Sequence, residues 1–404
     1  PQQTGKSLSV DNVITGHFRD SGGRIAVTLE AINVDRNDVL WRESLDAPAA
    51  DLIAMRNELS NRIRTGFLPS LHLTEQSEPN RPRNDEAYAL FLRAAAMSND
   101  PEPNKQALAT LERVVQLDPT YAPAWGALAA RSYYDAEYAT GGDPAFDRAE
   151  VAVRRALSID PDLLDASKRK IIMAVEKGDL EDGYREAREL LNRRPENADA
   201  HFTMSYVLRY GGLLNESAAE CDRALAIDPT NAGFRSCGLT FLRLGNIPRA
   251  KLFIDLDAGS AWNRSLMVYV LLHEGDPDGA LRIGESGPGN RVESNWWPTL
   301  RASLLKHPQK EVTQEARRVS AAMMNWRDSE PIYYSAEIMG FARENEEALR
   351  LLRRSVEKRY CAYPAMDADP AFAQIRGTPQ FQEIRQMAIA CQQRFLQFRS
   401  QLPP

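Results

Sequence analysis

The chain has 404 residues, 26% of them charged, with a formal net charge of −6 and a pI near 5.6. Lys and Arg are scattered along it, so we expect no broad basic face and no nucleic-acid partner. The longest apolar stretches are broken by charge, as in LMVYVLLHE ending at Glu274, and fall short of the roughly 20 apolar residues of a membrane span. We therefore expect no direct membrane insertion by this segment.

The amino-terminal part predicts a small α/β module over residues 1–68. Alternating runs at 13–19, 24–34 and 39–45, separated by two turn clusters, indicate an antiparallel meander. An amphipathic helix over 51–67 is expected to cover one face of this sheet. Residues 69–84 contain three prolines among polar residues and predict a semi-rigid linker. The chain opens PQQTGKSLSV, without Met, and is expected to be part of a longer product.

A 34-residue period governs the helical region. Pro161, Pro195 and Pro229 follow successive helices at this spacing, and Gly178 and Gly212 fall at the turns within pairs, with Asn246 one period further. This period is typical of helix pairs stacked into a solenoid. We predict a mainly α fold, with a solenoid over 85–377 that is degenerate after about 255, followed by a capping helix and tail over 378–404.

The spacing, and endings such as Ala156–Pro161 and Ala224–Pro229, resemble the tetratricopeptide repeat over about 84–254. Ser167 and Arg235 depart from its usual core residues. The resemblance implies that the first helix of every pair lines a concave face that binds a protein or peptide. The register places these side chains on that face as candidate partner-binding residues: Lys168, Tyr206, Arg209, Tyr210 and Arg243, with Tyr133 and Tyr134 from an earlier repeat.

Two further stretches resemble bacterial regulators. Residues 10–63, including VITGHFRDSGGRIAVTLEAINV, are similar to the latter half of a TolB amino-terminal-like domain, and YCAYPAMDADPAFAQIRGTPQF resembles the segment that ends repeat arrays in receptor-like serine/threonine kinases. Related regulators include adenylyl/guanylyl cyclases and CadC-type activators. The resemblance implies the scaffolding or sensory region of a larger signalling protein, either cytoplasmic or the extracytoplasmic part of a membrane-anchored protein. The alternative is a small-molecule sensor with its ligand between the module and the solenoid.

Catalytic and cofactor motifs are not expected. His273-Glu274 begins like a zinc-protease helix, but Pro277 stands where the second His would be, and Pro is not a ligand, so we expect no metal and no cofactor. The four cysteines are interpreted as small buried hydrophobic residues, with a Cys221–Cys237 disulfide left open. Trp296 and Trp297 are interpreted as core at a repeat junction rather than as an exposed anchor.

Overall fold

A computed structural model describes residues 1–8, 10–67, 80–287 and 290–403. The chain forms two compact units, Pro1–Ser132 with Val151–Leu163, and Tyr133–Glu150 with Leu164–Pro404. The first unit therefore contains the sheet and the first helical pair. Most of the linker expected at 69–84 lies outside the described residues. None of the helices in the described ranges combines the length and the apolar character needed to cross a bilayer.

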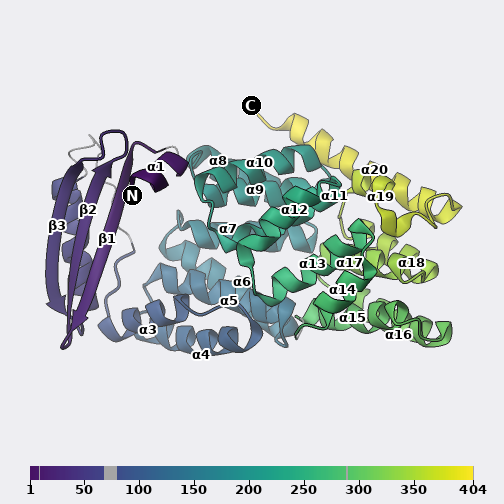
Figure 1. Cartoon of the computed structure of the whole chain (residues 1–404), viewed down its shortest axis with the longest axis horizontal. Helices are drawn as coiled ribbons and strands as arrows, with labels where there is room; N and C mark the ends of the chain where they lie inside the picture. The colour runs from purple at the N-terminus through teal and green to yellow at the C-terminus, as the bar shows by residue number, and fades with distance from the viewer. Residues whose placement is uncertain (9, 68–79, 288–289, 404) are drawn as a thin grey trace. The chain divides into compact units, whose positions relative to one another are not determined.

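The first unit contains the predicted antiparallel meander (Figure 1). Gly22 and Gly23, at φ of +63° and +82°, make the two-residue turn between the first strands, a backbone that glycine adopts without a Cβ clash. The Arg62 guanidinium ties the following helix to the last strand by donating to Glu43 Oε2 at 3.0 Å and Ser44 O at 2.8 Å. The elements are α1 (Gln2–Leu8), β1 (Asn12–Ser21), β2 (Arg24–Asn33), β3 (Val39–Pro48), α2 (Leu52–Arg62) and η1 (Ile63–Phe67).

The remaining helices follow one another as antiparallel pairs, and α3 starts at Asp85, where the sequence predicts the helical array to begin. The two long pairs that open the array are α3 (Asp85–Ala95) with α4 (Pro101–Leu117), and α5 (Ala122–Tyr138) with α6 (Gly142–Ile159). In the first unit, Arg131 on α5 donates to the carbonyls of Ala94, Met97 and Ser98 and so satisfies carbonyl groups at the carboxyl-terminal end of α3.

In the second unit, helix pairs continue through the region after residue 255, where the sequence predicts degenerate repeats. This arrangement confirms the predicted, mainly α fold of helix pairs. Its helices are α7 (Leu164–Lys177), α8 (Leu180–Arg193), α9 (Ala198–Tyr210), α10 (Leu214–Ile227), η3 (Ala232–Ser236), α11 (Cys237–Arg243), α12 (Ile247–Ile254), η4 (Asp255–Asp257), α13 (Ala261–Glu274), α14 (Pro277–Gly284), α15 (Arg291–Leu304), α16 (Gln309–Met323), α17 (Ser329–Phe341), α18 (Asn345–Glu357), α19 (Tyr363–Ala368), η5 (Pro370–Phe372) and α20 (Pro379–Gln401).

Glycines form the turns inside the pairs, as the period predicts. Gly178, Gly212 and Gly245 have φ of +98°, +75° and +71°, the left-handed conformation that ends a helix with little steric cost. The expectation that Asn246 occupies this position in the third turn is wrong by one residue. Asn246 instead caps α12 by accepting a hydrogen bond from the Arg249 N–H.

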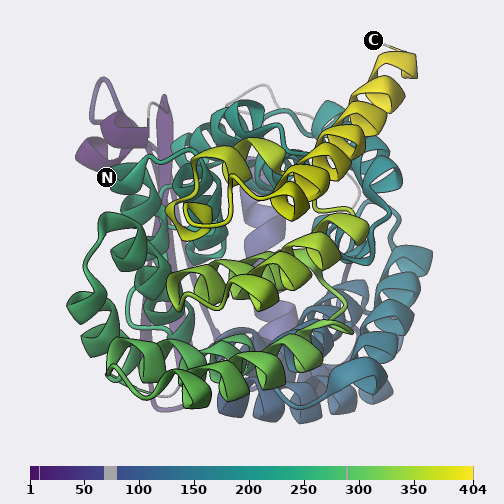
Figure 2. The same cartoon turned by 90° about the vertical axis from the view of Figure 1, so that its right-hand side faces the viewer.

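The helical array of the second unit closes on itself. The helices α17 and α20 contact α7 and α8, which lie more than 150 residues earlier. Cys361 N–H donates to Tyr210 O at 2.8 Å, and Gln392 Nε2 donates to Gly212 O at 2.8 Å. Helix α20, expected to cap the end of the array, therefore packs both on α18 and on the early helix α8 (Figure 2).

All four cysteines are buried and paired in disulfides, Cys221–Cys237 and Cys361–Cys391. Their interpretation as buried residues is confirmed and the open Cys221–Cys237 pairing is present, whereas the Cys361–Cys391 pairing was not predicted. The first disulfide joins α10 to α11, and the second fastens the segment after α18 to α20. Trp296 is 1% exposed, so its assignment to the core is confirmed.

Gly212→Ala is expected to destabilise the second unit more than Gly245→Ala. Both glycines have the same left-handed backbone, which costs a non-glycine residue about 1–2 kcal/mol. A Cβ at Gly212 would lie 2.4 Å from Cys361 O, whereas a Cβ at Gly245 meets nothing within 4 Å. Chemical denaturation of the two variants measures the difference, and equal losses would show that the close approach at Gly212 contributes nothing.

Candidate functional site

The first helices of successive pairs in the second unit line one cavity of about 140 Å³. Every pair from α5 to α17 contributes to its wall. One lining side chain from each element is Tyr134 on α5, Arg169 on α7, Phe202 on α9, Arg235 on η3, Leu239 on α11, Trp262 on α13, Glu293 on α15 and Tyr334 on α17. The cavity is therefore the interior of the closed array, on the face where the repeat register places partner-binding residues.

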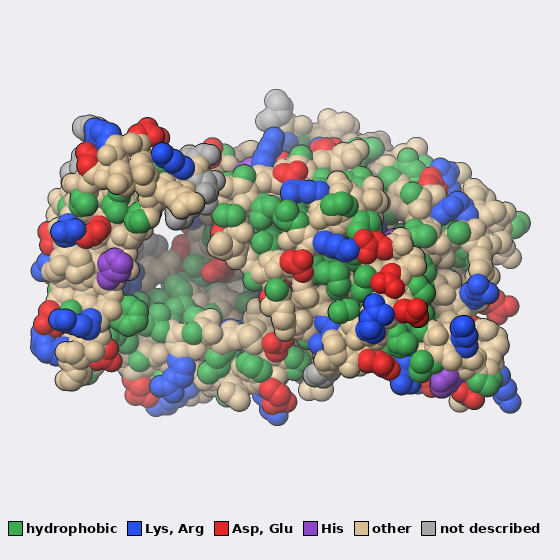
Figure 3. All heavy atoms as spheres, in the orientation of Figure 1, with side chains coloured by type: hydrophobic (Ala, Val, Ile, Leu, Met, Phe, Trp, Pro, Cys, Tyr) green, Lys and Arg blue, Asp and Glu red, His purple; other side chains and the backbone are tan. Residues whose placement is uncertain are grey.

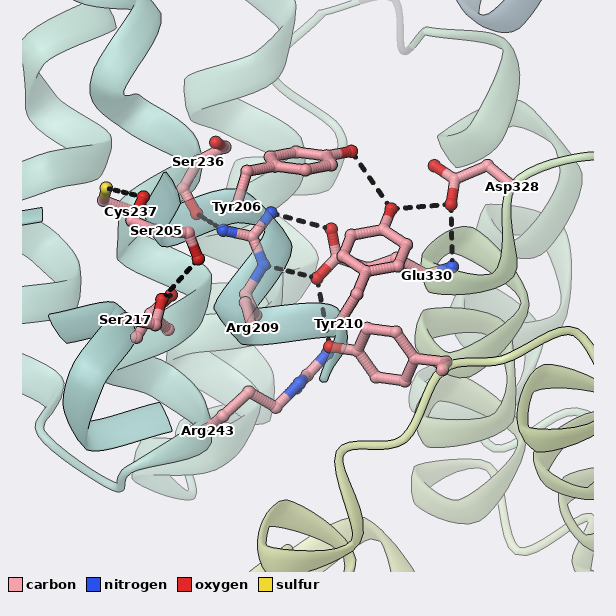
Figure 4. A network of polar contacts seen from close by, with 12 residues as sticks. Ser205, Tyr206, Arg209, Tyr210, Ser217, Ser236, Cys237, Arg243, Asp328 and Glu330 are labelled. Atoms are coloured by element: carbon pink, nitrogen blue, oxygen red, sulfur yellow. Dashed lines mark hydrogen bonds and ion pairs between the residues drawn. The ribbon is translucent and has the colours of Figure 1, made fainter. Parts of the chain in front are cut away.

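Arg209, one of those residues, is fully buried against α17. Its Nε and Nη2 donate to the two oxygens of Glu330 at 2.8 and 3.0 Å, and its Nη1 donates to Ser236 O at 3.1 Å. Figure 4 shows the guanidinium beside Tyr206 and aimed at Glu330. A two-point guanidinium–carboxylate pair of this kind fixes orientation as well as charge. Arg209 therefore holds α17 against α9.

Tyr206 and Tyr210, also predicted at the site, belong to a buried chain of hydroxyls and carboxylates. The Tyr206 hydroxyl donates to Glu176 Oε1 at 2.7 Å. It also lies 3.0 Å from the Tyr210 hydroxyl, which donates to Asp328 Oδ1 at 2.7 Å (Figure 4). Burial raises the pKa of Glu176 to about 8, although hydrogen bonds from Tyr133 and Tyr206 oppose the shift. Burial likewise raises the pKa of Asp328.

Arg243 is buried in a second charged cluster. Its guanidinium binds both oxygens of Glu337, with Nη2 to Oε2 at 2.9 Å. His273 Nε2 lies 3.5 Å from Glu337 and 3.4 Å from Asp369. Burial by itself would lower the pKa of His273, but hydrogen bonds to Asp369 and Glu337 outweigh it and raise the pKa to about 10.

The His273, Glu337 and Asp369 side chains converge as metal ligands do, but their charges are already balanced. The Arg243 guanidinium and a protonated His273 neutralise the two carboxylates, and the same arginine occupies both Glu337 oxygens. Hydrogen bonding to His273 lowers the pKa of Asp369 to about 2, against the effect of burial. The cluster is therefore a structural ion network that joins α11, α13 and α17 to the segment after α19.

The remaining predicted residue, Lys168, stays half-buried at the cavity and lies in its basic part. Its Nζ is 2.7 Å from Asp199 Oδ1. Arg235 lies 3.2 Å from Asp257, and Arg169 stacks on the Tyr133 ring at 4.0 Å. Lys168 and Arg235 each have a carboxylate partner, whereas Arg169 has an aromatic one.

The pKa of Tyr134, which the repeat pattern also places on the inner face, responds to the positive charge of this region. Burial by itself would raise its pKa, but Arg235, Arg169 and Lys168 outweigh burial and lower it to about 8. The cations therefore set up a positive potential at the Tyr134 hydroxyl. A ligand group placed here would meet the same potential.

Aromatic rings make up much of the rest of the wall. Tyr138 and Trp262 meet edge to face with centroids 4.0 Å apart, and the Arg235 guanidinium lies 5.0 Å from the Trp262 ring. Deeper in, the Tyr269 hydroxyl and Trp296 Nε1 are buried without a hydrogen-bond partner in the described structure. Rings that each carry a polar edge suit a ligand that is partly apolar.

Sequence reasoning missed Arg169, Trp262 and Tyr138 as cavity residues. Arg169 directly follows Lys168, and an inner-face helix exposes more than one position per turn to a closed interior. Arg235 was noted only as a departure from the repeat pattern. Its presence where a small core residue is usual was the available signal.

No family model and no curated protein sequence matches the chain. Solved structures do match, including PilW, described as a widely conserved type IV pilus biogenesis factor (18% identity, 55% of this chain and 100% of that chain, TM-score 0.37). TTC0263, a thermophilic TPR protein in Thermus thermophilus, matches at 15% identity over 49% and 98% of the two chains, with a TM-score of 0.36. The human IFIT1 dimer with m7Gppp-AAAA matches at 10% identity over 86% and 78%, with a TM-score of 0.48. At such identities these similarities assign no ligand to the chain.

Arg209→Gln is expected to lower the free energy of unfolding by about 3 kcal/mol, because it leaves the Glu330 carboxylate buried without its counter-charge. Arg209→Gln combined with Glu330→Gln is expected to recover most of this loss, since no isolated charge is then buried. A double-mutant cycle by chemical denaturation measures the coupling. Additive losses would contradict a closing role for the pair.

Tyr134 is expected to ionise near pH 8, below the ordinary tyrosine value. Ultraviolet absorbance of phenolate during a pH titration should show this component in the wild type and lose it in Tyr134→Phe. Tyr138→Phe is the matched control, because burial raises the pKa of Tyr138 well above its ordinary value. Persistence of the component in Tyr134→Phe would rule out the positive potential described above.

Proposed function

We propose that this chain is a non-catalytic scaffold that binds a protein or peptide partner in the cavity of its second unit. The supporting observation is that the first helices of successive pairs line one interior space, and that most of them present aromatic or charged side chains to it. Rigid aromatic surface and guanidinium groups are the side chains that most often anchor protein partners.

The five residues expected to bind a partner have two proposed roles. Lys168 lies at the cavity with its ammonium group part-exposed, and we propose that it contacts the partner together with Tyr134 and Trp262. The other four, Tyr206, Arg209, Tyr210 and Arg243, act indirectly, because their polar groups are already bonded to buried carboxyl groups and hold the cavity wall in place. Truncating these four would disturb folding and binding together.

A protein partner is favoured over nucleic acid by the charge distribution. On the face shown in Figure 3, basic and acidic side chains are interspersed. The net charge of −6 also opposes binding to a polyanion.

The larger setting that we propose is a bacterial signalling protein. The sheet and helix of the first unit agree with what the TolB-like resemblance implies, and an effector such as a kinase or cyclase domain would lie elsewhere in the full product. The two disulfides favour an extracytoplasmic position for this region, because disulfides persist in oxidising compartments.

Partner capture by the full chain tests the binding role. The variant pair Trp262→Ala with Lys168→Gln removes cavity surface, whereas Lys170→Gln removes an exposed charge from the outer side of the same helix α7. We expect the cavity variant to lose the proteins captured by the wild type, as quantified by mass spectrometry, and Lys170→Gln to keep them. Equal capture by all three chains would contradict binding in the cavity.

Reduction is expected to destabilise the second unit. The disulfides close loops of 16 and 30 residues, and cross-links of this length stabilise a fold by about 3 kcal/mol each. Thiol titration of protein isolated under non-reducing conditions should find no free thiol, and reductant should lower the melting temperature. A fully reduced protein with unchanged melting temperature would contradict both the disulfides and the proposed compartment.

A further inference from the structure

Arg169 is a buried cation that forms no ion pair with a carboxylate in the described part of the chain. Its side chain belongs to the cavity wall, the residue is 7% exposed, and its Nε has no hydrogen-bond partner. In the described structure its Cζ lies 4.0 and 5.3 Å from the centroids of the Tyr133 and Tyr134 rings, and the Tyr134 side chain is also a hydrogen-bond partner. Stacking on rings offsets only part of the free energy lost when a guanidinium leaves water.

The neighbouring charges do not neutralise Arg169. Asp199 pairs with Lys168, and Asp257 pairs with Arg235. Glu176 lies about two helical turns after Arg169 on α7. One of its oxygens accepts hydrogen bonds from both Tyr133 and Tyr206. Since burial raises the pKa of Glu176 to about 8, this carboxyl group is largely protonated at neutral pH. One positive charge on the cavity wall is therefore left over.

We propose that Arg169 anchors a single carboxylate of the ligand, and that the adjoining apolar or aromatic part of the ligand lies against Tyr134, Tyr138 and Trp262. The guanidinium presents paired N–H groups that match the two oxygens of a carboxylate. The inference rests on the proposed function, since it names the chemical group that the cavity recognises. The carboxylate belongs either to a peptide or to a free small organic acid, and the experiment distinguishes these sources.

The opposite wall limits the charge of the ligand. Asp328, Glu330 and Glu293 line the same cavity, and Glu330 is already paired with Arg209. Burial raises the pKa of Asp328 and Glu293, so neither group supplies a counter-charge for an anion, and a single unpaired guanidinium balances one negative charge. A monocarboxylate therefore fits the cavity better than a phosphate or a dicarboxylate.

Calorimetry with matched acids and amides tests the inference on the full chain. The small probes are phenylacetate and phenylacetamide, and the peptide probes are acetyl-Ala-Ala-Phe with a free or an amidated carboxyl terminus. We expect at least one acid to bind, with its amide about tenfold weaker or more, since a charge-assisted hydrogen bond contributes that much. The small acid alone, the peptide acid alone, or both will bind, and this identifies the source of the carboxylate.

Two variants locate the interaction. Arg169→Gln is expected to weaken acid binding about tenfold or more without affecting the amides, while Arg169→Lys keeps part of the affinity and Lys170→Gln keeps all of it. Because Arg169 has no carboxylate partner, its replacement orphans no buried charge, and circular dichroism and the melting temperature verify the fold. The acid–amide difference in the wild type is a test that depends on no variant.

Three results would overturn the carboxylate anchor: acids and amides that bind equally, acids that bind Arg169→Gln as tightly as the wild type, or no acid that binds the wild type. Protein capture that is lost in the Trp262 and Lys168 variant but kept in Arg169→Gln would overturn the anchor and retain the scaffold. Loss of acid binding in Arg169→Gln with no cavity-dependent protein capture would retain the anchor and reject the protein partner.

Discussion

Two buried guanidinium–carboxylate pairs organise the second unit. Arg209 and Arg243 are buried at the inner face of α9 and α11, and their partners Glu330 and Glu337 lie on α17, 121 and 94 residues later. Either arginine would be strongly unfavourable without α17 in place. The two pairs therefore join distant repeats, and the cavity exists because the array closes around it.

The periodic part of the fold was predictable from sequence, and the closure was not. Prolines and glycines at a 34-residue spacing act on the local backbone, so their effect can be read from neighbouring residues. Arg209 and Arg243 were correctly assigned to the inner face by the same register. Their burial depends on α17, and an ion pair between residues this far apart leaves no spacing pattern in one sequence. The Cys361–Cys391 disulfide, which depends on the docking of α20, was missed for the same reason.

Three inner-face arginines have different roles because different groups face them. Arg169, Arg209 and Arg243 come from successive first helices and all stack on tyrosine rings. Arg209 and Arg243 face acidic residues of α17, whereas Arg169 faces the cavity beside Tyr134. The repeat register placed Arg209 and Arg243 on this face and did not include Arg169, so it could not separate the two that stabilise the fold from the one that we propose binds a ligand.

The turn glycines connect the local repeat to the closed array. A Cβ at Gly178 would lie within 3.5 Å of Lys358 O and Arg359 Cγ, and one at Gly212, one period later, would lie 2.4 Å from Cys361 O. The four residues 358–361 therefore lie against two consecutive turns. An open solenoid tolerates the gain or loss of a repeat, because each unit contacts only its neighbours. Here an additional helix pair between α10 and α17 would carry residues 358–361 past both turns. The number of helix pairs in this array is therefore fixed by its closed geometry. Duplication of a repeat would break the contacts that residues 358–361 make with both turns.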